Sequence, residues 1–377
     1  MKTISFLDLK SQYAPLRNKI LESFEKVFDS TAFIHGPEVS AFENALAKKL
    51  GVEEAIGVSC DTDGLYASLR MIGIGPGDEV ITTDHTAIPT AEAITMTGAQ
   101  VVFSDTCPDT CNIDVNDAKK HISPRTKAIV VVHLYGQPAD LDPFVDLAKA
   151  DGLYLIEDCA QALGAQYRGK NVGTIGDVGV YSFFPSKPLG GIGDGGAVIS
   201  RHEDLIKRIR MFCDHGRKSK FIHEFEGINS RLDTINAAML SIALPHLDEW
   251  NQKRRDIAEL YRQYLKEIEE VDLPCVLNEV NHVWHVYAIR VPEREPFQKF
   301  LKNNGIATGI HYPIALNLLP AYAYLGKGPG SYPNAEYHCA HTVSLPMHPA
   351  MTREDVEYIG ETIRNFFLKK KTGAQND

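Results

Sequence analysis

The 377-residue sequence lacks the segments that would assign it to a membrane, to the secretory route or to nucleic acid. No apolar run reaches the length that spans a bilayer, and the first residues contain no apolar signal segment. The net charge is −10, and a basic run occurs only at Lys369–Lys371, which argues against nucleic acid as the main partner. We therefore expect a cytoplasmic globular protein without a membrane or nucleic-acid partner.

Cysteine is also sparse. Only Cys107 and Cys111 lie close together among the seven cysteines, and no second pair completes a zinc-binding pattern. The odd number and wide spacing favour reduced thiols in a cytosol rather than a disulfide framework. We expect no metal site.

What the sequence does contain is an alternation of short Val- and Ile-rich runs with helical patterns over the first 250 residues. The runs show no apolar–polar alternation, so each predicted strand is buried on both faces. This pattern predicts an α/β fold with a mostly parallel central sheet covered by helices. The predicted strands are 55–59, 79–82, 101–104, 128–134, 153–156, 178–184 and 196–200.

The order of elements changes after residue 250, and 377 residues exceed one ordinary core. A helix is predicted at 232–250, a long charged helix at 251–269 and a closing helix at 353–369. Between them the pattern predicts a strand at 284–291, a helix at 295–304 and a strand at 307–311. We predict two domains: a large α/β domain over 1–250, beginning with an extended arm, and a smaller C-terminal α+β domain over 251–377.

The stretch 181–196 carries the first candidate for chemistry. A strand-like apolar run ends at Pro185, Lys187 follows, and the next residues form a loop with five glycines. A lysine that follows a buried strand can be partly desolvated. Desolvation lowers the pKa of its amine and makes the amine a usable nucleophile toward carbonyls. A single loop lysine is more often simply solvated, so the residues around Lys187 decide between the two.

Three more polar residues lie where predicted strands end, which is where α/β sheets bind ligands. Thr62 opens a helix, where free N–H groups and its hydroxyl can hold a phosphate, although an ordinary helix cap has the same pattern. Asp158 follows a buried strand and needs a cationic partner. With Lys187 and Ser182 at the same edge, this set suits pyridoxal 5'-phosphate (PLP), whose pyridine nitrogen an aspartate keeps protonated.

Nine motifs distributed over nearly the whole chain resemble those of the DegT-type nucleotide-sugar aminotransferases, a branch of the fold type I PLP enzymes. The resemblance implies the fold type I PLP-dependent transferase architecture and PLP as the cofactor. The motifs are Phe6–Lys10, Gly75–Ile81, Leu134–Gly136, Glu157–Gln161, Ser182–Lys187, Gly193–Gly196, Asn229–Asp233, His311–Pro313 and Ser344–His348.

The resemblance also implies roles for single residues. Lys187 corresponds to the lysine that holds the cofactor as a Schiff base and then moves the proton. Asp158 corresponds to the partner of the pyridine nitrogen, and Gln161 to the residue against the ring near its phenolic oxygen. Thr62 and Ser182 correspond to phosphate ligands.

The family's asparagine that reaches the phosphate from the other subunit corresponds to Asn229. The resemblance therefore implies a homodimer with two shared active sites, in which one subunit lacks part of each site.

The likeness is greatest to the subgroup that aminates UDP-2-acetamido-3-keto-glucuronate, with L-glutamate as the implied amino donor. The chain shares Ser186–Gly190 and His311–Asn317 with that subgroup. The resemblance implies that Arg231, His311 and Tyr312 hold a carboxylate of the sugar or of the donor. From residue types alone, Arg231 suits a carboxylate or a salt bridge with Asp233, and His311 suits either a ligand or a structural role. His215 fits a simple turn.

Two positions depart from the family pattern. Asp61 stands where glycine is common, and an inward carboxylate would repel a phosphate, so we expect Asp61 to face away. Ala87 stands where an aromatic ring often stacks on the cofactor, which leaves that face open or covered by another side chain such as His85.

Two other functions fit the sequence. One is amination of C4 or C3 on a 6-deoxy keto-sugar nucleotide, and the other is a non-catalytic regulatory relative. A related dehydratase is disfavoured, because dehydratases of this family carry histidine in place of the lysine at 187.

Overall fold

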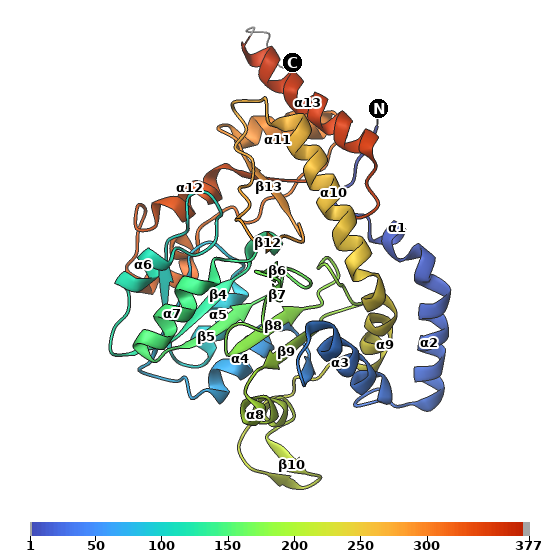
Figure 1. Ribbon diagram of the computed structural model, residues 1–377, viewed down its shortest axis with the longest axis vertical. Coiled ribbons are helices and arrows are strands. Elements are labelled where there is room, and N and C mark those ends of the chain that lie inside the picture. The colour runs from blue at the N-terminus through green and yellow to red at the C-terminus, as the bar shows by residue number, and fades with distance from the viewer. Residues whose placement is uncertain (1, 372–377) are drawn as a thin grey trace.

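A seven-stranded sheet forms the centre of the computed structural model, which describes residues 2–371 (Figure 1). The strand order is β1-β9-β8-β5-β4-β2-β3. Neighbours from β8 to β3 run parallel, and β9 is antiparallel to both β8 and β1. The predicted mostly parallel sheet is thus confirmed. The strands are β1 (Ala55–Val58), β2 (Glu79–Thr83), β3 (Gln100–Ser104), β4 (Thr126–Val132), β5 (Tyr154–Asp158), β8 (Val178–Ser182) and β9 (Gly196–Ser200).

Helices cover both faces of this sheet, as its apolar strands require. One face packs against α3 (Pro37–Leu50), α6 (Val115–Lys120), α7 (Leu141–Asp151) and α9 (Thr234–Ala243). The other face packs against α4 (Asp61–Met71), α5 (Pro89–Met96) and α8 (Glu203–Cys213). Large side chains such as Phe42 and Leu46 have no exposed surface, and burying each contributes about 1.5–3 kcal/mol.

A third apolar core lies beyond the sheet, around α10 (Leu247–Leu265), α11 (Arg294–Asn303) and α13 (Arg353–Lys371). Two antiparallel strands, β13 (Tyr287–Arg290) and β14 (Thr342–Leu345), complete it. The amino-terminal arm also contributes: Ile4 is buried in this core, donates its N–H to Gly305 O (2.8 Å) and accepts from Ala307 N (3.0 Å). Figure 1 shows α10 leading from the sheet layer to α13. The division into domains 1–250 and 251–377 stays a prediction.

Two predicted elements differ in the structure. The strand at 307–311 is wrong, because this segment makes only an isolated bridge, Gly309 with Ser344, before Pro313 turns the chain. The helix at 232–250 is interrupted: α9 ends at Ala243 and α10 starts at Leu247. Between them Pro245, which has no N–H to donate, lies in the short helix η3 (Leu244–His246).

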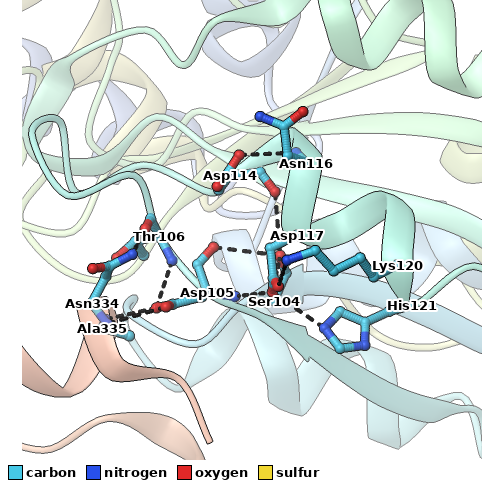
Figure 2. Close-up of polar contacts among 10 residues, drawn as sticks. All are labelled: Ser104, Asp105, Thr106, Asp114, Asn116, Asp117, Lys120, His121, Asn334 and Ala335. Carbon is cyan, nitrogen blue, oxygen red and sulfur yellow. Dashed lines mark hydrogen bonds and ion pairs between the residues drawn. The ribbon is translucent and has the colours of Figure 1, made fainter.

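A late segment of the chain returns to the sheet layer. It comprises η4 (Leu316–Leu318), η5 (Pro320–Leu325) and α12 (Pro333–His341), and it packs against the face that carries α4 and α5. Figure 2 shows how α12 begins: Asp105, after β3, accepts from Asn334 N (3.1 Å) and Ala335 N (2.8 Å). A carboxylate at the first turn accepts hydrogen bonds from N–H groups that have no partner within the helix. Its negative charge also interacts favourably with the helix dipole. The same segment is held at the carboxyl end of β2, where Leu316 N donates to Asp84 O (3.0 Å) and Asn317 N donates to Asp84 Oδ1 (2.8 Å).

Apart from α2 (Arg17–Ser30), the remaining elements are short. A hairpin of β10 (Arg217–Ser219) and β11 (Ile222–His223) projects beyond α8 (Figure 1). The others are α1 (Leu9–Tyr13), η1 (Ala14–Leu16), α2 (Arg17–Ser30), η2 (Leu134–Gly136), β6 (Gln166–Tyr167), β7 (Lys170–Asn171) and β12 (Val280–Asn281). Across residues 2–371, no helix combines the length and apolar character that crossing a membrane requires.

Candidate active site

Asp158 is the last residue of β5, and its side chain is buried at the carboxyl end of the sheet. Thr90 Oγ1 donates to Asp158 Oδ2 (2.8 Å), and Ala160 N donates to Oδ1 (3.1 Å). Burial above all, and then the charge of Asp61, raise the pKa of Asp158 above its usual value, against the effect of Lys187 and the two hydrogen bonds. A cation placed here would gain a carboxylate that is already oriented.

Lys187 follows β8, the parallel neighbour of β5, so its amine and Asp158 lie at one edge of the sheet. A turn brings it there, in which Lys187 N donates to Phe184 O (2.8 Å). Burial lowers the pKa of the Lys187 amine, while the charges of Asp61 and Asp158 oppose that change. A lowered pKa increases the neutral, nucleophilic fraction of the amine at neutral pH.

The glycines after Lys187 allow the loop to fold back on itself. A Cβ at Gly190 would lie 2.1 Å from Pro185 O, and one at Gly191 would lie 2.1 Å from Asn236 Oδ1. Gly191 N donates to Phe183 O (2.7 Å) and closes the loop. The loop therefore has room only for glycine at these two places.

Helix α4 begins at the same edge, with Cys60 as its cap: Cys60 Sγ accepts from Asp63 N (3.5 Å). Thr62 lies half-buried in this first turn. The expectation that Asp61 faces away is wrong, because Ser182 Oγ donates to Asp61 Oδ1 (2.9 Å). A helix start favours a negative group, and Ser182 supplies the donor that turns the carboxylate inward.

Gln161 links the sheet edge to the late segment. Its Oε1 accepts from Tyr135 N (2.6 Å), and its Nε2 donates to the Tyr312 hydroxyl (3.1 Å). Burial, and next the charge of Asp158, raise the pKa of Tyr312, so this phenol stays protonated and keeps a proton to donate. The structure thus brings Tyr312 into one cluster with Asp158, Gln161 and Lys187.

Two histidines line this cluster and are neutral. Burial and the charge of Lys187 lower the pKa of His311 to about 4; its Nδ1 lies 2.8 Å from Ser344 Oγ, and its ring stacks on Phe6. Burial lowers the pKa of His85 to about 3. Tyr312 N donates to His85 Nε2 (3.3 Å), so His85 supports the wall of the site. Ala87 is half-buried, and covering of a cofactor face by His85 stays a prediction.

Within the described residues of one chain, Asn229 and Arg231 are joined to Asp214 rather than to this cluster. Arg231 Nη1 donates to Asp214 Oδ1 (2.9 Å), so the salt bridge considered with Asp233 is instead made with Asp214. Asn229 is exposed, and its backbone forms an isolated β-bridge with that of Asp214. His215 occupies a turn with a positive φ of 61°, as its sequence context predicts.

Residue-level reasoning missed Thr90 and the role of Glu157. Glu157 is buried on the opposite side of β5 and accepts from Gly173 N (2.6 Å), Ile175 N (2.8 Å) and Gly176 N (2.6 Å). His133 Nε2 lies 3.0 Å from Glu157 Oε2, and its Nδ1 accepts from Ala139 N (3.0 Å). A buried glutamate beside Asp158, the predicted partner of the pyridine nitrogen, was the one available signal, since such a carboxylate must be hydrogen-bonded.

The donor set fits PLP. A nucleophilic amine (Lys187) and an oriented buried carboxylate (Asp158) match an aldehyde and a pyridine nitrogen. The hydroxyls of Thr62, at a helix start, and of Ser182, at the end of β8, match a phosphate. Asp61 does not fit this set, because its carboxylate already accepts the hydrogen bond that the Ser182 hydroxyl would donate to a phosphate.

Comparison with known proteins agrees with this chemistry. The model of the DegT/DnrJ/EryC1/StrS aminotransferase family matches residues 15–364. The chain is 42% identical to a Geobacillus stearothermophilus "Pleiotropic regulatory protein", with 97% of this chain and 98% of that one covered. It is 40% identical to a Streptomyces venezuelae "dTDP-3-amino-3,4,6-trideoxy-alpha-D-glucose transaminase", with 96% of each chain covered. It is 39% identical to a Pseudomonas aeruginosa "UDP-2-acetamido-2-deoxy-3-oxo-D-glucuronate aminotransferase", with 96% and 100% covered.

Solved structures give the same fold. S. venezuelae DesV, in complex with a ketimine intermediate, superposes with a TM-score of 0.95 at 40% identity, covering 97% of this chain and 99% of that one. A Bacillus subtilis structure with bound cofactor PMP superposes with a TM-score of 0.90 at 27% identity, covering 97% and 85%. The protein has the fold type I aminotransferase structure, and it belongs to the DegT/DnrJ/EryC1/StrS aminotransferase family of PLP-dependent sugar aminotransferases.

Proposed function

We propose that this protein moves an amino group from L-glutamate to the C3 keto group of UDP-2-acetamido-3-keto-glucuronate, with PLP as cofactor. One observation carries the chemistry: the Lys187 amine, with its pKa lowered by burial, lies at the same sheet edge as the oriented carboxylate of Asp158. That pair supplies the nucleophile and the counter-charge that this cofactor requires.

The residues then have separate tasks. When bound, PLP supplies an electron sink for negative charge on the substrate carbon. Lys187 Nζ would hold the cofactor between turnovers and, once released, would move the proton from the donor's α-carbon to C4′ of the cofactor. Asp158 holds the positive charge at the pyridine nitrogen. Thr62 and Ser182 would bind the phosphate, and Gln161 would lie near the phenolic oxygen.

Position C3 has support from two relatives of almost equal identity, because the names of both place the amino or keto group at carbon 3. The two names differ in the sugar: one is a deoxy sugar on dTDP and the other a uronate on UDP. Tyr312 offers a hydroxyl donor to either sugar. A uronate carboxylate would also need a cation. His311 is neutral, so this cation would have to be Arg231, which pairs with Asp214 here.

The alternative substrate is therefore a 6-deoxy keto-sugar nucleotide. It is favoured by the same pairing of Arg231 with Asp214, which leaves this arginine without a free charge for a sugar carboxylate in one chain.

Shared active sites in a homodimer belong to this proposal, as does a cytoplasmic location. The loop that carries Lys187 exposes Phe184 (49%) and Ile192 (48%), and the projecting hairpin exposes Phe221 (84%). Exposed apolar side chains at these places suit a subunit interface that covers the site. In such a dimer Asn229 would reach the phosphate of the partner's cofactor, and Arg231 would face the partner's substrate.

A visible absorption spectrum with added PLP tests the reaction. We expect a band from cofactor attached to Lys187, loss of that band on adding L-glutamate, and its return on adding the keto sugar. Lys187→Ala should fold but show neither the band nor turnover, whereas Lys170→Ala, an exposed lysine on β7, should behave like the wild type. Comparing the uronate with the 6-deoxy keto sugar decides the substrate. A protein that binds no PLP, or whose band no amino acid removes, would instead fit the regulatory alternative.

A further inference from the structure

The hydroxyl of Ser182 has one proton, and in this structure it is already engaged. Ser182 Oγ donates to Asp61 Oδ1 over 2.9 Å, and Ser182 is itself buried. The other hydrogen bond at this oxygen comes from Phe184 N (3.4 Å), which uses an acceptor lone pair. Because a serine hydroxyl is a single donor, Ser182 cannot donate to Asp61 and to a phosphate at the same time.

Asp61 also acts on the rest of the site through its charge. Among charged groups it is the leading influence that raises the pKa of Lys187, ahead of Asp158. It is likewise the leading charged group that raises the pKa of Asp158. A carboxylate with these effects lies within the charge cluster of the active site rather than on its outside.

The main chain at Asp61 is fixed, so only its side chain is free to move. A Cβ at Gly196, on β9, would lie 2.8 Å from Asp61 N, which shows how closely the two backbones approach. The neighbouring Cys60 caps the helix, and Thr62 lies in the same turn. An incoming phosphate would therefore meet the Asp61 carboxylate at the start of α4, where two negative groups repel each other strongly in a partly buried setting.

We propose that Asp61 is a built-in competitor of the cofactor phosphate, whose carboxylate must leave Ser182 before the phosphate can bind there. The inference rests on the proposed function, since it requires PLP at Lys187. Asp61 thereby weakens binding of the phosphorylated cofactor more than binding of the ring and aldehyde alone.

The test compares two ligands on the intact protein, PLP and pyridoxal, which lacks the phosphate. Dissociation constants are measured from the absorption band of ligand attached to Lys187. Asp61→Asn keeps an acceptor for Ser182 but removes the charge, and Asp61→Gly removes both. We expect the ratio of PLP affinity to pyridoxal affinity to rise roughly ten-fold in each variant, because both ligands attach to Lys187 and share any change at its amine, whereas only PLP carries the phosphate.

Asp63→Asn is the matched control, because Asp63 lies in the same helical turn but accepts from Ser59 Oγ (2.5 Å) rather than from Ser182. It should leave the ratio of the two dissociation constants unchanged. Using two replacements at Asp61, each checked by circular dichroism, keeps the test valid if one of them misfolds.

The inference is overturned if the ratio of PLP to pyridoxal affinity is the same in the wild type and in both Asp61 variants, or if it is lower in the variants. Failure of the wild type and of every variant to attach either ligand would instead refute the proposed function, and the inference with it.

Discussion

Thr90 donates its hydroxyl to Oδ2 of Asp158 over 2.8 Å, with both side chains buried. The Thr86 hydroxyl lies 3.2 Å from that of Thr90, so two hydroxyls at the start of α5 lead to the carboxylate at the end of β5. The aspartate is consequently oriented before any cofactor arrives.

Replacing Thr90 with valine should disturb this orientation while preserving shape. A hydrogen bond to a charged group contributes about 1.5–3 kcal/mol, so we expect kcat to fall about ten- to hundred-fold, with a smaller change in KM. The cofactor band should also change its pH dependence, because Asp158 loses a donor. Thr95→Val, on the same helix but with its hydroxyl directed to Glu92 O, is the control. Equal kcat values for wild type and Thr90→Val would show that the hydroxyl has no role in the reaction.

Glu157→Gln should act on stability. The buried carboxylate of Glu157 accepts three backbone N–H groups from the loop 173–176 and lies 3.0 Å from His133 Nε2. A glutamine would turn an NH₂ group toward some of these donors, so we expect a loss of about 3–5 kcal/mol in the free energy of unfolding. Urea denaturation measures it, with the exposed Glu53→Gln as the control. An unchanged unfolding midpoint would contradict this role.

The stability of the protein should depend on pH through Asp84, which is buried after β2. Its Oδ1 accepts from Asn317 N (2.8 Å), and burial, followed by the charges of Asp105 and Glu336, raises its pKa to about 8. From roughly pH 4, where an unfolded aspartate titrates, to about pH 8, the native state binds the extra proton. The free energy of unfolding must then fall as pH rises through this window, by at most about 1.4 kcal/mol per pH unit.

Asp84→Asn removes that titration. The melting temperature of the variant relative to wild type should be higher at about pH 8 than at about pH 5, as measured by thermal unfolding at both. Asp109→Asn, an exposed aspartate, should show no such difference. The prediction is wrong if Asp84→Asn follows the wild-type pH curve.

Phe221→Ser tests the proposed dimer. Phe221 lies at the tip of the hairpin and is 84% exposed, so its loss should not destabilise the fold of one chain. If the hairpin reaches a second subunit, the variant dimer should dissociate at a higher protein concentration than the wild-type dimer in analytical ultracentrifugation. The variant should also bind PLP more weakly. Tyr324→Ser, also exposed (65%) but on η5, is the control. If the wild type is monomeric, the shared-site proposal is refuted, while the proposed role of Lys187 is unaffected.

The sheet and the Lys187–Asp158 pair could be read from the sequence because each rests on local patterns. Strands buried on both faces are continuous apolar runs, and parallel strands place their carboxyl ends together.

The orientation of Asp61 could not be read in this way. Its donor, Ser182, lies 121 residues further along the chain, so the local context contained only the expected repulsion. Thr90 was missed for the same reason, since its partner lies 68 residues away. The wrong strand at 307–311 shows a third limit: an apolar pattern does not reveal whether a segment finds a neighbour along its whole length or, like Gly309, at a single residue.

The pairing of Ile4 with residues 305–307 has a consequence for synthesis. During synthesis, Ile4 finds its place only after some three hundred further residues have been made. Until then the arm has no partner in its own core, and a nascent chain must carry it unpaired. A bulky tag fused directly before Ile4 would therefore interfere with the last stage of folding rather than the first.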